Sequence, residues 1–154
     1  MAPFVVLVTL FVLLSILGHF QMPVAFGWWT ALRLALAGMF LLTASAHWGK
    51  RRVDLIRMVP TSFPRPEILV TVTGVLEVMG AVGLMLPELA PYAALGLSFM
   101  LVAIFPANIR AARQGLTIAN RPVPALLPRT LLQIVFLAAT ITVFVAGKYA
   151  ALAP

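Results

Sequence analysis

The sequence contains no cysteine, and only four of its 154 residues are acidic. A chain without cysteine forms no disulfide, thiolate metal site, iron–sulfur cluster or CxxC electron relay of its own. Charged residues of both signs make up 10% of the chain, whereas soluble domains carry roughly a quarter. These shortages exclude the surface of an ordinary water-soluble domain.

Histidine is equally scarce, and its two copies are poorly placed for metal chemistry. His19 and His47 end two successive apolar runs, which would cross a membrane in opposite directions. Helices of 20 residues rise about 30 Å, so the two imidazoles should lie on the order of 25 Å apart. We therefore expect no metal site, no bis-histidine haem within one chain and no intrinsic cofactor.

Apolar residues dominate the chain, at 62% of the sequence with a mean hydropathy of +1.06. This composition is typical of membrane proteins. The net charge of +7 would favour nucleic acid as a partner if the protein were soluble. Because the basic residues lie between apolar runs, we expect membrane lipids with anionic headgroups as partners, and no nucleic acid.

Five apolar runs are long enough to cross a bilayer, which takes about 20 helical residues. The predicted fold is an all-α, polytopic membrane helical bundle with a single domain, 1–154. Its spans are expected at about 3–20, 30–48, 67–86, 91–110 and 129–148. The first run resembles a secretory signal, but no Lys or Arg precedes it and no A-x-A site follows, so we predict a retained helix.

The segment 50–59 between the second and third spans is amphipathic. On a helical wheel its charges at 50, 51, 54 and 57 share one side, and the apolar residues 53, 55, 56 and 59 fall largely on the other, with Arg52 an exception. This pattern predicts a short interfacial helix in the headgroup plane, ended by Pro60. A plain solvated basic loop is the alternative.

Glu77 lies in the middle of the third span. A charged side chain there costs at least about 2.5 kcal/mol, so Glu77 must face the bundle interior, be paired or be protonated. Its helical neighbours, Thr73, Gly74, Gly80 and Ala81, are small, which predicts a closely packed helix or a small cavity beside it. The carboxyl is either a structural hydrogen-bonding group or a group that handles protons or binds a ligand.

Four other polar residues are candidates for the same ligand site. His47, Asn108 and Gln133 are predicted to fall in one inner layer of the membrane, where they would bind the polar head of a lipophile or form hydrogen bonds between helices. Pro106 should free backbone carbonyls beside Asn108. Arg33 is expected near the outer surface, where it snorkels to the headgroups or reaches toward Glu77.

The same polar positions resemble those of DoxX-type membrane proteins. The resemblance rests on 34–48 (LALAGMFLLTASAHW), the proline-rich link 58–66, the glycine-flanked Glu77 in 74–84, the F-P-A-N end at 105–108, and Arg129 with Gln133. It implies a four-helix DoxX-like core, with the N-terminal span as an addition. It further implies membership of membrane redox or oxidative-stress complexes in a bacterial cytoplasmic membrane.

Three functions are compatible with these residues. The first is a subunit that binds a lipophilic small molecule, with a quinone as the candidate and a membrane or peripheral redox protein as a partner. The second is a non-catalytic assembly, chaperone or scaffold protein that docks a partner helix on the glycine face of the third span. The third is an isomerase-like protein for lipids or sterols, which would need Glu77 and His47 at one substrate and is disfavoured by their unequal depths. A homo-oligomer is compatible with all three.

The distribution of basic residues predicts the orientation in the membrane. Nine lie around the second and fourth connections, at 50, 51, 52, 57, 65, 110, 113, 121 and 129, whereas Arg33 and Lys148 lie at the other side. By the positive-inside rule, the N-terminus is inside and the C-terminus outside. A topology reporter fused after Lys148 should be active only outside the cytoplasm, and one placed within 111–128 only inside. A cytoplasmic reporter after Lys148 would contradict the five-span count.

Overall fold

The computed structural model describes residues 2–21, 27–119 and 121–152. These residues form six helices, α1 (Ala2–Gln21), α2 (Trp28–Ser45), α3 (Arg52–Met58), α4 (Pro66–Met85), α5 (Ala90–Arg113) and α6 (Leu126–Leu152). A two-stranded antiparallel ribbon, β1 (Thr117–Ile118) and β2 (Arg121–Pro122), joins α5 to α6. All but α3 of the described helices are long and apolar enough to cross a membrane, which confirms the five predicted apolar helices.

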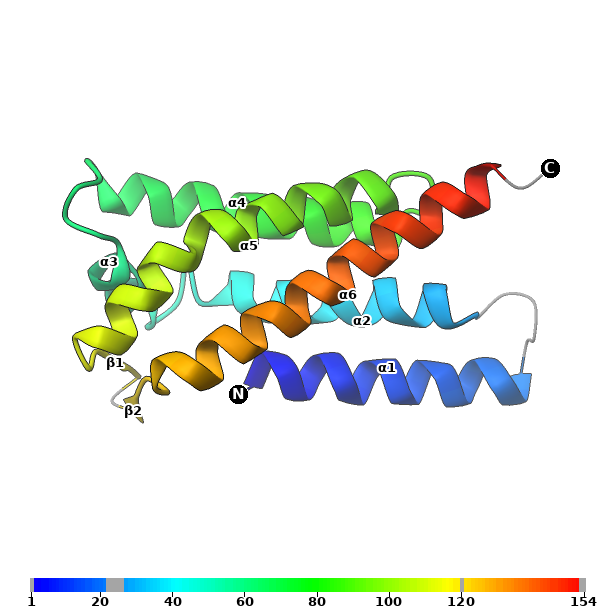
Figure 1. Ribbon diagram of the computed structural model, residues 1–154, viewed down its shortest axis with the longest axis horizontal. Helices are drawn as coiled ribbons and strands as arrows, with labels where there is room; N and C mark the ends of the chain where they lie inside the picture. The colour runs from blue at the N-terminus through cyan, green and yellow to red at the C-terminus, as the bar shows by residue number, and fades with distance from the viewer. Residues whose placement is uncertain (1, 22–26, 120, 153–154) are drawn as a thin grey trace.

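Helix α2 lies at the centre of the bundle, where it packs against α1, α4 and α6 (Figure 1). Its inward face consists mainly of small side chains such as Ala31 and Ala35, which are fully buried, with Leu36 and Phe40 filling the core. Helix α5 packs against α4 and α6 and completes a four-helix arrangement. Helix α1 packs mainly on α2 at the edge of this group, in agreement with a core of four helices plus one N-terminal helix.

Hydrogen bonds between helices supplement this packing. The Ser98 hydroxyl of α5 donates to the Thr140 hydroxyl of α6 over 2.7 Å in a fully buried position. The Trp29 indole N–H donates to the Val143 carbonyl over 3.0 Å, which joins the start of α2 to α6. Such bonds stabilise helices in a medium where burial of apolar surface adds little to their association.

The predicted interfacial segment 50–59 does contain a helix, α3. Its Asp54 differs from the prediction. Asp54, expected on the water-facing side, has a side chain only 18% exposed and accepts a hydrogen bond from the Ala119 backbone N–H over 2.9 Å. The reason is that α3 is held between α4, α5 and strand β1, so neighbouring elements decide which residues are covered.

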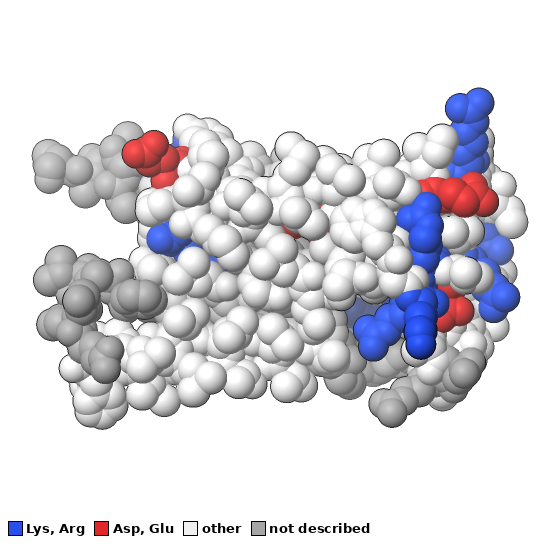
Figure 2. All heavy atoms as spheres, turned by 180° about the vertical axis from the view of Figure 1, so that it is seen from behind, with Lys and Arg blue, Asp and Glu red and all other residues white. Residues whose placement is uncertain are grey.

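Lys and Arg side chains gather at the end of the bundle that carries α3 and the ribbon (Figure 2). We call this the basic end. The connections 49–65 and 114–125 both lie there, as the topology prediction required for its two basic connections. The side of the membrane that this end faces stays a prediction.

Two glycines provide a matched test of the helix packing. A Cβ added at Gly83 would lie 2.7 Å from the Ala93 Cβ, whereas one at Gly96 would meet nothing within 4 Å. Gly83→Ala should therefore push α4 and α5 apart and destabilise the protein by roughly 1–3 kcal/mol. Gly96→Ala should be neutral or stabilising, because alanine favours a helix over glycine. Thermal unfolding in detergent would measure both, and equal melting temperatures would contradict the packing of α4 on α5.

Candidate functional site

A buried acid and an imidazole meet between α2 and α4. His47 lies just beyond the C-terminal end of α2, and Glu77 lies in the middle of α4. The His47 Nδ1 atom is 3.7 Å from the Glu77 Oε2 atom. The two residues are only 9% and 5% exposed. They form the one ion-pair contact within the bundle among the described residues, and we call them the His47–Glu77 pair.

Gly74 is what allows the two side chains to approach. It lies one turn before Glu77 on the same face of α4. A Cβ at this position would lie 2.6 Å from the His47 Cβ and 2.8 Å from its Cγ. The imidazole therefore packs directly on the backbone of α4. The small residues beside Glu77 were expected to accommodate a closely packed helix or a small cavity. One of them, Gly74, instead accommodates the His47 side chain.

The hydrogen bonds around the pair are incomplete. The His47 Nδ1 atom lies 3.3 Å from the Thr43 carbonyl oxygen. The Thr43 hydroxyl donates to the Phe40 carbonyl over 2.9 Å. The Glu77 Oε2 atom is fully buried and has no hydrogen-bond partner among the described residues.

Burial also affects the imidazole. A charged ring would lose its hydration in this position. In its neutral form the ring has one nitrogen that donates and one that accepts a hydrogen bond. A neutral imidazole beside a carboxyl can exchange a proton with it or with a third group.

The contact between His47 and Glu77 corrects the expectation that the two residues lie at unequal depths. Helix α4 begins at Pro66, three turns before Glu77, and therefore extends beyond the end of α2. His47 consequently lies level with the third turn of α4. The sequence alone could not set this offset, because it depends on how the connection 49–65 folds back.

Arg52, which sequence reasoning did not select, holds this offset in place. Its guanidinium donates to the His47 carbonyl over 2.8 Å, to the Thr71 hydroxyl over 2.8 Å and to the Glu67 carbonyl over 3.1 Å. It therefore ties the end of α2 to the first turns of α4. The sequence offered one indication of this role: on the helical wheel of segment 50–59, Arg52 is the charged residue that falls on the apolar side.

Asn108 and Gln133 lie between α5 and α6, and no hydrogen bond connects them to His47 or Glu77. Asn108 Oδ1 accepts from Arg129 Nη2 over 2.6 Å, and Gln133 Nε2 donates to the Leu101 carbonyl over 2.5 Å. Each bond joins α5 to α6. The described contacts therefore correspond to the interhelical alternative and do not assemble these two residues with His47 into one site.

Arg33 is far from Glu77 and does not extend to the surface. It is 6% exposed, donates to the Leu84 and Met85 carbonyls over 2.8 and 2.7 Å, and lies 5.2 Å from the centre of the Trp29 ring. Arg33 therefore does not reach Glu77, and its location near the outer surface stays a prediction. The carbonyls at the end of α4 lack helical donors, and the guanidinium satisfies two of them.

Comparison with known proteins gives a family but no activity. Residues 36–145 match the family described as a domain of unknown function (DUF8561). No curated protein and no solved structure matches the chain significantly. The matched range contains the His47–Glu77 pair and leaves out α1 and Arg33. The DoxX resemblance is neither supported nor opposed by this match.

The pair can be tested through protein stability. Glu77→Ala should leave a cavity beside His47 and destabilise the protein by about 2 kcal/mol, whereas Glu77→Gln keeps the volume and should change stability much less. Glu88→Ala, on the exposed turn between α4 and α5, is the matched control and should have no effect. Thermal unfolding in detergent measures all three. Equal stability of the Glu77→Ala and Glu88→Ala variants would show that the carboxyl is not packed as described.

Proposed function

We propose that this chain, which belongs to the DUF8561 family, is a multi-pass membrane protein that binds the polar group of a lipophilic small molecule at the His47–Glu77 pair. Asn108, Gln133 and Arg33 are assigned to the structural support of the bundle, because each bonds to a neighbouring helix. The proposed location is a bacterial cytoplasmic membrane, with the basic end inside.

The observation that supports this proposal is the partnerless Oε2 atom of Glu77. A buried polar atom without a hydrogen bond costs about 1–3 kcal/mol, and more when it carries charge. A ligand that brings a hydroxyl or carbonyl to this atom would supply the missing bond. The protonated acid can donate to a carbonyl, and the ionised acid can accept from a hydroxyl.

A quinone fits this requirement in both of its stable redox states. The oxidised ring presents carbonyl oxygens, which accept a hydrogen bond from a protonated carboxyl or from an imidazole N–H. The reduced ring presents hydroxyls, which donate to a carboxylate or to an imidazole nitrogen. The DoxX resemblance supports the same ligand class, and with it an association with membrane redox or stress-response complexes.

Proton transfer to a lipid or sterol, as in an isomerase, is the second candidate. The observation that favours it is the 3.7 Å contact between His47 and Glu77, which brings an acid and a base to one place. The objection from unequal depths no longer applies. A substrate whose double bond lay beside both groups could gain a proton at one alkene carbon from one group and lose a proton from the carbon next to the double bond to the other, which moves the double bond by one position.

The scaffold alternative has less support, because the glycine face of α4 is already covered. Added Cβ atoms at Gly74, Gly80 and Gly83 would collide with His47, Leu97 and Ala93 respectively. These glycines serve packing within the chain. A partner helix would have to bind elsewhere on the bundle.

A short-chain ubiquinone provides the test of binding. We expect the wild-type protein in mild detergent to bind it saturably, Glu77→Gln to retain binding within a few-fold, and Glu77→Ala to lose at least about tenfold in affinity, as for a lost hydrogen bond to a charged or buried group. Ser98→Ala removes a buried hydroxyl between α5 and α6 and should bind like the wild type. Unchanged binding by Glu77→Ala would overturn the proposed site.

Infrared difference spectra would separate binding from proton transfer. Addition of the quinone should shift a carboxyl band that is absent from Glu77→Gln. If the Glu77→Gln variant binds the ligand but has lost the activity of the wild type, the proton-transfer function is favoured, because glutamine can form hydrogen bonds but cannot exchange a proton. A wild-type spectrum without any Glu77 response to bound quinone would contradict a direct contact.

A further inference from the structure

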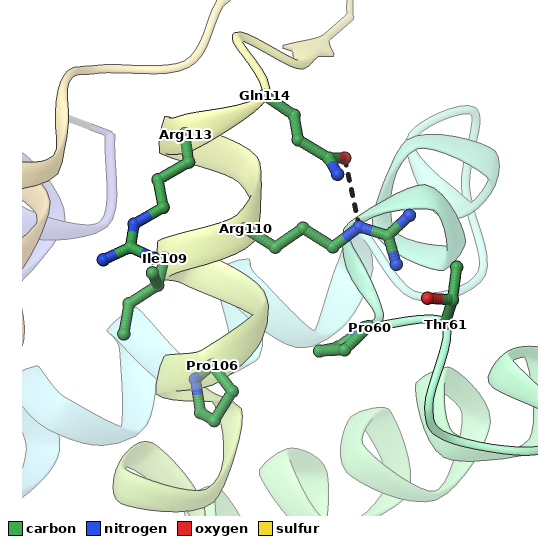
Figure 3. A pocket seen from close by; sticks show the side chains of 7 residues that line it. All are labelled: Pro60, Thr61, Pro106, Ile109, Arg110, Arg113 and Gln114. Carbon is green, nitrogen blue, oxygen red and sulfur yellow. Dashed lines mark hydrogen bonds between the residues drawn. The ribbon is translucent and has the colours of Figure 1, made fainter.

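A second site lies at the basic end, away from the His47–Glu77 pair. A pocket of about 310 Å³ opens between the last turns of α5 and the start of the α3–α4 connection (Figure 3). Its polar wall consists of Thr61, Arg110, Arg113 and Gln114. No acidic residue lines it, so its charge is not compensated within the pocket.

Arg110 is held in position by the protein itself. Its Nη1 atom donates to the Val59 carbonyl over 2.5 Å, and its Nε atom donates to the Gln114 side-chain oxygen over 3.1 Å. The guanidinium is thereby directed toward Thr61, as Figure 3 shows. Among the described residues its Nη2 atom has no acceptor, so one edge of the fork remains able to donate to a ligand.

Arg113 adds a second positive charge from the other side of α5. Its side chain extends away from Arg110 in Figure 3 and makes no hydrogen bond with any described residue. A group that lay across this face of α5 would therefore have one guanidinium on each flank. Arginine is suited to such a role, since its planar donors match phosphate oxygens and are weakly hydrated.

The remaining wall is apolar and belongs to a membrane-crossing helix. Pro106 and Ile109 of α5 line it, with Pro60 opposite. Pro106 and Ile109 lie within the last two turns of α5, which begins at Ala90. In a bilayer, this position would lie where hydrocarbon gives way to headgroups. A ligand that carries both an anionic group and an apolar chain matches this composition better than a soluble anion does.

We propose that this pocket binds the phosphate of an anionic phospholipid, with the Nη2 atom of Arg110 donating to one of its oxygens, Arg113 adding positive charge at the opposite edge of the pocket, and the glycerol and first acyl carbons against Pro106 and Ile109. The site is independent of the proposed function, because no residue of the His47–Glu77 pair lines it. The lipid would come from the leaflet that meets the basic end. It would also fasten the α3–α4 connection to α5, since Pro60 and Thr61 form one side of the pocket.

Native mass spectrometry of the protein in mild detergent, titrated with phosphatidylglycerol, would test this. Arg113→Gln should lower the affinity for the first bound lipid several-fold, because it removes one of the two positive charges that line the pocket and breaks no hydrogen bond to a described residue. Arg57→Gln is the matched control: it removes the same charge from the same end, at a side chain 66% exposed and outside the pocket. It should change the affinity less than twofold. Arg110→Gln should weaken binding at least as much as Arg113→Gln, with its folding checked by thermal unfolding.

Two further titrations identify the ligand class. Phosphatidylcholine, whose headgroup has no net charge, should bind at least about tenfold more weakly than phosphatidylglycerol. Inorganic phosphate at millimolar concentration should not displace the bound lipid. Equal losses in Arg57→Gln and Arg113→Gln would mean diffuse attraction by the basic end and would overturn the proposal. Displacement by inorganic phosphate would overturn it in favour of a soluble anion.

Discussion

Polar side chains inside an apolar bundle need hydrogen-bond partners, and in this protein the backbone carbonyls of neighbouring elements supply several of them. Arg33 donates to the end of α4, Gln133 to Leu101 on α5, Trp29 to Val143 on α6, and Arg52 to the His47 carbonyl. In each case the donor belongs to one element and the acceptor to another. The same bond that satisfies a carbonyl thereby sets the position of one helix against the next.

Glu77 is the exception to this arrangement. It brings further acceptors into the bundle, and one of its oxygens is buried without a donor. Arg33 Nε and Ser15 Oγ are also buried without a partner among the described residues, but Arg33 still donates to two carbonyls through Nη1. For Glu77 no side-chain hydrogen bond is found among the described residues, and such a buried atom costs about 1–3 kcal/mol.

The sequence predicted the helices well because each one depends on local properties. Length and hydropathy determine a span, and the prolines at 60, 64 and 66 separate α3 from α4. Glu77 could also be selected, since a carboxylate in the middle of an apolar run is costly wherever its helix lies. The role of Arg33 could not be foreseen, because its partners are carbonyls at the end of a helix 51 residues further along the chain.

The offset between α2 and α4 along the bundle axis could not be predicted from the sequence either. The depth of His47 against Glu77 depends on the folding of the connection 49–65 and on the contacts of Arg52, neither of which has a periodic signature. Asn108 and Gln133 bond between α5 and α6, which the sequence left open as the alternative to ligand binding. Their grouping with His47 relied on an assumed common layer, and the structure instead pairs them with Arg129 and with the backbone of Leu101.

The bond between Asp54 and the Ala119 backbone has a consequence for the order of events during membrane insertion. Its two ends are separated along the chain by α4 and α5, each of which is long and apolar enough to cross a bilayer. In a membrane, Asp54 would meet Ala119 only after both helices had crossed and the chain had returned to its starting side. The bond would then join the two connections that flank the inserted α4–α5 hairpin.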